Sequence, residues 1–250
     1  MNRLHSAWQR LFFNATATSP DPLAAPPLLD ADGRCRALLL ELARPADWQL
    51  LGAVWRGVQT ELGLPAPAIA VNGEDGFQLW FSLAEPVAAA EGQVLLQALC
   101  RRFLPAELAP GRLRLWPSAD KAQAPRLPPF ELKTGGECWA AFVAPDLAPV
   151  FADSPWLDVP PGDEGQADLL ARLQPLGAEP LRQAREALLA SPAAAASEPP
   201  ASAPTSSAAA ASTWSEPRAF LLAVMNDASQ PMQLRIEAAK ALLPFSSAAG

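Results

Sequence analysis

Short apolar runs alternate along the chain with longer segments in which large hydrophobic residues recur at helical spacing. Residues 36–43 form a continuous apolar run that is too short for a typical helix, and Pro45 follows it closely, so this run predicts a buried strand. Helices are predicted at 46–62, where Gly63 is the expected stop, and at 88–103. Four more strands are predicted, at 67–72, 76–83, 111–117 and 136–144.

The resulting order of elements is β-α-β-β-α-β-β. This order predicts an α+β fold of the ferredoxin-like, or split βαβ, type, in which an antiparallel sheet carries both helices on one face. The other face is then expected to be open to a ligand or a partner. The proline-rich segment 145–161 is the alternative cover for that face, and two further helices, near Asp163 and at 177–190, complete the domain.

An amphipathic helix is predicted at the N-terminus. In "MNRLHSAWQRLFF" the residues Leu4, Trp8, Leu11 and Phe12 fall on one helical face. Two arginines are too few for firm anchoring to a membrane surface, so we interpret this segment as a helix that docks on the domain.

An Ala/Ser/Pro-rich stretch at 191–213 divides the chain. It contains one charged residue and cannot bury a core, which predicts a disordered linker between a domain of residues 1–190 and a tail of residues 214–250. In the tail, a serine followed two residues later by a proline begins each of two predicted helices, which form an αα-hairpin. The hairpin is too small to bury its apolar stripe, so we expect it to bind a partner protein. The expected anchors are Leu221, Val224, Leu234 and Ile236.

Composition and charge narrow the classes of partner. Half of the 250 residues are hydrophobic, and the net charge of -7 leaves no overall positive field to attract nucleic acid, so phosphates would need a local basic patch. Cys35, Cys100 and Cys138 include no CxxC pair, which favours reduced thiols over disulfides or a structural metal. No apolar run reaches the ~20 residues of a membrane span. We therefore predict a cytoplasmic protein without cofactor, metal or membrane partner.

The common catalytic motifs GxGxxG, GxxxxGK[ST], HExxH and GxSxG do not occur, and a single histidine, His5, disfavours His-dependent triads. Glu74 and Asp75 in "VNGEDGF" are typical of a hairpin turn that needs positive φ angles, and no third metal ligand accompanies them. Most tryptophans are expected in the core. The alternative is a platform that stacks bases beside the Arg101-Arg102 pair, formed by Trp48, Trp55, Trp80, Trp116, Trp139 and Trp156.

A strand ending in "LLLELA", a helix, and a glycine-bearing turn before "GFQLWFSL" together resemble the catalytic half of the archaeo-eukaryotic primase family, which includes primase-polymerases. The resemblance covers about residues 36–150. It implies a pair of acidic residues, one residue apart, that bind divalent metal at the end of the first core strand. It also implies a histidine on the strand after the turn, which meets the nucleotide phosphate.

This chain departs from that pattern at two of three positions. Glu41 occupies the first acidic position, but Ala43 occupies the second and Gln78 occupies the histidine position. A lone carboxylate holds Mg²⁺ poorly, because the ion keeps its waters and phosphoryl transfer needs metals that clamp the reacting oxygens. We therefore expect the family's nucleotidyl-transfer activity to be absent.

The tail carries a second resemblance. "FLLAVMND" followed by "LRIEAAKALLPF" is similar to a helical segment of phage terminase small-subunit-like proteins. This resemblance implies the same DNA-processing or mobile-element context as the first.

Three functional hypotheses follow. The leading one is a non-catalytic, primase-like accessory or adaptor protein with weak affinity for single-stranded nucleic acid or nucleotide. Its groove would be lined by Glu41, Gln78, Trp80, Arg112 and Arg114. The second is a protein-interaction module without nucleic-acid binding. The third is a divergent enzyme in which Glu41 meets Asp75 or Asp120 to hold metal.

Overall fold

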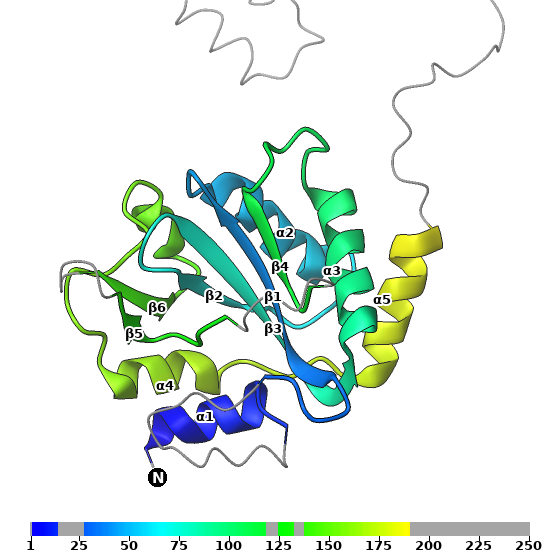
Figure 1. Cartoon of the computed structure of the whole chain (residues 1–250), viewed down its shortest axis with the longest axis horizontal. Helices are drawn as coiled ribbons and strands as arrows, with labels where there is room; N and C mark the ends of the chain where they lie inside the picture. Colours follow the sequence, from blue (N-terminus) through cyan, green and yellow to red (C-terminus); the bar gives the residue numbers. More distant parts are fainter. Residues whose placement is uncertain (1, 15–27, 119–124, 133–137, 191–250) are drawn as a thin grey trace, which may run out of the picture. The chain divides into compact units, whose positions relative to one another are not determined.

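The computed structural model describes residues 2–14, 28–118, 125–132 and 138–190 (Figure 1). These residues form a mixed α/β domain around a six-stranded sheet in the order β4-β1-β3-β2-β6-β5, with every strand pair antiparallel. The α+β class and the antiparallel sheet are thus confirmed. The strands are β1 (Arg34–Ala43), β2 (Ala68–Val71), β3 (Gly76–Ala88), β4 (Leu113–Trp116), β5 (Phe130–Glu131) and β6 (Trp139–Val143). The helices are α1 (Arg3–Leu11), α2 (Trp48–Thr60), α3 (Ala89–Phe103), the 3₁₀ helix η1 (Ala148–Phe151), α4 (Asp163–Ala171) and α5 (Ala178–Ala190).

Helices α2 and α3 pack on one face of the sheet, and α5 packs on α3 (Figure 1). Asp47 is the N-cap of α2, since its side-chain oxygen accepts a hydrogen bond from the Leu50 N–H at 3.0 Å. Trp48, in the first turn, then lies against Phe77 of β3, with 5.4 Å between ring centroids. Side chains alternate along β3, so its odd-numbered residues face these helices and its even-numbered residues face the opposite side.

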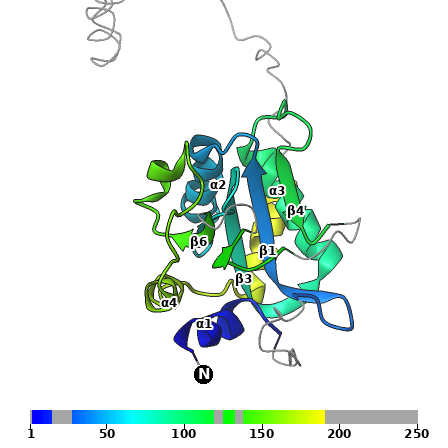
Figure 2. The same cartoon turned by 60° about the vertical axis from the view of Figure 1, so that its left-hand side comes forward.

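The opposite face is not open, so that expectation was wrong. Phe12, just after α1, is fully buried and packs on Trp80 of β3 and Phe142 of β6, with ring centroids 5.8 and 6.2 Å apart. Leu127 is also buried, and Figure 2 shows the chain before β5 passing in front of the sheet. The docked N-terminal helix is confirmed, but the sequence alone did not reveal that it closes the sheet.

Arg36 of β1 fastens the end of α1 to the sheet. Its guanidinium donates to the backbone carbonyls of Leu83, Phe13 and Arg10 at 2.9, 3.0 and 2.9 Å. Burial lowers the pKa of this guanidinium. A cation at the carbonyl end of a helix is also favoured by the helix dipole, so Arg36 stabilises the cover formed by α1.

Further differences from the predicted elements concern the length of β3, the extra strand β5 and segment 145–161. β3 continues to Ala88, five residues beyond the predicted end, and a bulge in its partner lies between Cys35 and Ala37. β5 has two residues, too few for a sequence pattern. In segment 145–161, the alternative cover for the sheet face, Leu157 pairs with Trp139 of β6 through two backbone hydrogen bonds.

Two predictions lie outside the described residues, namely the linker at 191–213 and the tail hairpin. Among the helices that the structure does describe, none is both long and apolar enough to span a membrane.

Close contact between α2 and α3 depends on Gly57, because a Cβ atom at this position would fall on the ring of Phe103. We expect Gly57→Ala to lower the free energy of unfolding by about 1–2 kcal/mol, despite the better helix propensity of alanine. Gly165 of α4 is the matched control, since nothing lies within 4 Å of its added Cβ. Gly165→Ala should raise stability by up to about 1 kcal/mol. Urea unfolding measures both, and equal effects would contradict the described packing.

Candidate functional site

A chain of four polar side chains crosses three strands on the α1 side of the sheet. The register places Glu41 of β1 opposite Gln78 of β3 on one side and opposite Arg114 of β4 on the other. Gln78 Nε2 donates to Glu41 Oε2 at 2.6 Å, and Trp80 Nε1 donates to Gln78 Oε1 at 2.9 Å. Arg114 Nη1 lies 3.0 Å from Glu41 Oε1. Both carboxylate oxygens are therefore engaged within the fold.

The burial of these four side chains determines which ligands they can contact. The Glu41 side chain is 3% exposed, whereas that of Arg114 is 65% exposed. A buried carboxylate is costly unless it is paired and hydrogen-bonded, and here one guanidinium and one amide meet that need. Trp80 is fully buried with its N–H already bonded, so it cannot stack on a base.

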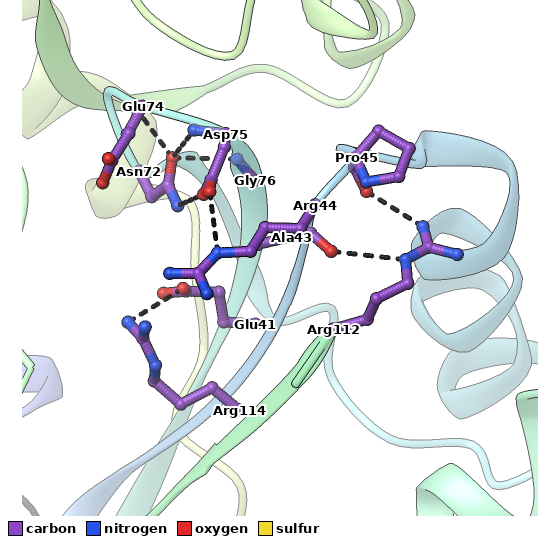
Figure 3. Close-up of polar contacts among 10 residues, drawn as sticks. All are labelled: Glu41, Ala43, Arg44, Pro45, Asn72, Glu74, Asp75, Gly76, Arg112 and Arg114. Atoms are coloured by element: carbon purple, nitrogen blue, oxygen red, sulfur yellow. Dashed lines mark hydrogen bonds and ion pairs between the residues drawn. The ribbon is translucent and has the colours of Figure 1, made fainter. Parts of the chain in front are cut away.

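A second ion pair lies at the end of β1 and includes Arg44, which sequence reasoning had not named (Figure 3). Arg44 has a positive φ of 57°, an uncommon conformation for a residue other than glycine. Its Nε donates to Asp75 Oδ2 at 3.2 Å. The Arg44 side chain is 65% exposed and that of Asp75 is 31% exposed, so in both ion pairs the guanidinium is the more exposed partner.

The turn between β2 and β3 is held by Asn72. Its Oδ1 accepts three hydrogen bonds, each 2.9 Å long, from the backbone N–H groups of Glu74, Asp75 and Gly76. Its Nδ2 donates to Asp75 Oδ1 at 3.1 Å. The interpretation of "VNGEDGF" as a hairpin turn is thus confirmed, and Asp75 serves the turn and the ion pair with Arg44.

Arg112 does not join the other predicted groove residues. Its Nη2 donates to the Pro45 carbonyl at 2.9 Å and its Nε donates to the Ala43 carbonyl at 3.3 Å, on the α2 side of the strand ends (Figure 3). Asp47 Oδ2 lies 3.9 Å from the same guanidinium. Arg112 therefore holds the β1–α2 connection in place.

The residues around Glu41 do not fit the divalent metal that the primase resemblance implies. The direct side-chain partners of Glu41 are an amide nitrogen and a guanidinium, which donate hydrogen bonds and cannot ligate a cation. Across the described ranges, no three His, Cys, Asp or Glu residues are grouped as a metal would require. Asp120, one of the carboxylates that could have joined Glu41, lies outside those ranges.

Two of the three cysteines, Cys35 and Cys100, are poor nucleophiles. Burial raises the pKa of both Cys35 and Cys100 to about 12, so these two thiols stay protonated at neutral pH.

No protein-family model matches the chain, and none of the curated proteins matches it. The tail anchors Leu221, Val224, Leu234 and Ile236 lie outside the described residues. The geometry around Glu41 is therefore the main structural indication of function.

The ion pair between Glu41 and Arg114 can be tested by a double-mutant cycle. Arg114→Ala leaves a buried carboxylate without its cation, so we expect the free energy of unfolding to fall by about 1–2 kcal/mol. In a Glu41→Gln background, Arg114→Ala should lower the free energy of unfolding by clearly less, because no buried charge remains. Additive costs, measured by urea unfolding, would show that the two residues do not interact.

Proposed function

We propose that the chain is a non-catalytic, primase-like accessory or adaptor protein of the ferredoxin-like type, acting in a nucleic-acid-processing or phage-related setting. The order β4-β1-β3-β2 supports the fold assignment, since β1 and β2 flank β3 and each β-α-β connection contributes a helix to the same face. The short motifs around Glu41 and Gln78 support the primase-like assignment.

The observation that carries the proposal is the engagement of Glu41. In a nucleotidyl-transfer site, a carboxylate at this strand end must present its oxygens to metal ions. Here Gln78 and Arg114 take both oxygens, and the position two residues on is the methyl group of Ala43. The same residues that would have supplied catalysis therefore stabilise the sheet.

A weak phosphate contact is the second part of the proposal. Arg44 and Arg114 present their guanidinium groups to solvent, while the carboxylates that pair with them are the more buried partners. Each arginine has one ion-pair contact, and guanidinium groups carry further N–H donors that suit phosphate oxygens. Since each pair is neutral overall, we expect low affinity for nucleotide or single-stranded nucleic acid.

The proposed adaptor role depends on contacts with a partner protein. The tail hairpin, with anchors Leu221, Val224, Leu234 and Ile236, remains a proposed partner-binding segment on the strength of its sequence. A pure interaction module is the competing function, and the burial of Trp80 favours it over base stacking.

A nucleotide-incorporation assay tests the central part of this proposal. The full chain, given primed and unprimed templates with Mg²⁺ or Mn²⁺, should incorporate no nucleotide. Inorganic triphosphate should bind weakly, and Mg²⁺ should not strengthen this binding, because Glu41 holds no metal. Incorporation that is lost in Glu41→Gln would overturn the non-catalytic assignment.

The phosphate contact has its own controls in the same titration. Arg44→Gly removes the guanidinium and suits the positive φ, so the fold should be retained while triphosphate affinity falls about tenfold. Arg182→Ala removes an arginine of similar exposure from α5, where it pairs with Glu179 and Glu186, and should leave affinity unchanged. Equal binding by all three proteins would overturn the role of Arg44.

A further inference from the structure

The connection between β6 and α4 exposes two large apolar side chains side by side. Leu147, directly before η1, is 52% exposed, and Val150 within it is 73% exposed. The Val150 N–H donates to the Leu147 carbonyl at 3.0 Å, and residues three apart on a 3₁₀ turn lie above one another. Val159, further along the same connection, is also mostly exposed.

This connection is firmly attached to the sheet. Ala148 is fully buried, and its N–H donates to the Ala144 carbonyl at 3.1 Å. Leu157 exchanges two backbone hydrogen bonds with Trp139, at 2.9 and 3.0 Å. A partner that binds the exposed side chains would therefore not have to order the backbone that carries them.

The sequence segment that carries these side chains has charged residues of one sign only. Residues 138–171 contain no lysine, arginine or histidine but six acidic residues, at 146, 153, 158, 163, 164 and 168. Arg3 of α1 neutralises Glu164 and Asp168. Asp146 and Asp153, which flank η1, have no ion-pair partner among the described residues.

We infer that Leu147 and Val150, framed by Asp146 and Asp153, form a docking surface for a basic amphipathic segment of a partner protein. Apolar side chains of the partner cover the exposed pair, and its lysines or arginines meet the two carboxylates. The same negative charge repels nucleic acid and anionic membranes. This surface shares no residue with the group formed by Glu41, Gln78, Trp80 and Arg114. The inference therefore does not depend on whether that group is catalytic.

Titration of the full chain with synthetic peptides tests the inference. The probe is a leucine–lysine amphipathic helix of about five turns, and its leucine–glutamate counterpart is the charge control. Two variants remove the two halves of the surface: Leu147→Ser with Val150→Ser, and Asp146→Asn with Asp153→Asn. Leu189→Ser, at an exposed leucine of α5, is the matched control.

We expect the lysine peptide to bind the unmodified chain, and each double variant to weaken its binding about tenfold. Leu189→Ser should leave this affinity unchanged, and the glutamate peptide should not bind. Equal affinity in all variants would overturn the inference, as would failure of the lysine peptide to bind. Binding of phosphatidylserine vesicles that is lost in the Leu147/Val150 variant would assign the surface to a membrane instead. All these substitutions are at exposed positions, and unchanged thermal melting verifies the fold.

Discussion

The pairing of β1 with β3 is the constraint on which the rest of the structure depends. Because side chains alternate along both strands, this register turns one set of residues toward α2 and α3 and the other toward α1. It also sets Glu41 opposite Gln78, within reach of Arg114 from the other neighbouring strand. A slip of one residue would turn Glu41 into the apolar layer beneath α2 and α3, so the ion pair and the hydrophobic core require the same register.

Closure of the second sheet face explains why polar groups there bond to one another rather than to water. Phe12 lies over Trp80, and Arg36 donates to the carbonyls of Arg10, in the last turn of α1, and of Phe13. Under such a cover each buried donor and acceptor needs a partner, and Gln78 meets this need by accepting from Trp80 and donating to Glu41. The amide thus satisfies both neighbours at once. A structural role for this chain of residues follows from burial alone.

Sequence reasoning located most of the secondary structure, because apolar runs and helical spacing are local signals. It also grouped Glu41, Gln78 and Trp80 in one predicted groove, and the structure joins these three side chains by hydrogen bonds. It missed the closed sheet face and β5, which depend on contacts between distant segments and leave no periodic pattern. It also missed Arg44, because no local sequence pattern indicates a positive φ at a non-glycine residue. It grouped Arg112 with Arg114, although their guanidinium groups lie on different sides of the strand ends.

The central claim is that Glu41 is a structural counter-ion and not a metal ligand. Nuclear magnetic resonance spectra recorded with Mn²⁺ test it directly, because the paramagnetic ion broadens signals from nearby nuclei. We predict that the side-chain amide of Gln78 and the indole N–H of Trp80 stay sharp as Mn²⁺ is added, and that both exchange slowly with solvent. Selective broadening of these two signals by Mn²⁺, abolished by Glu41→Gln, would contradict the account.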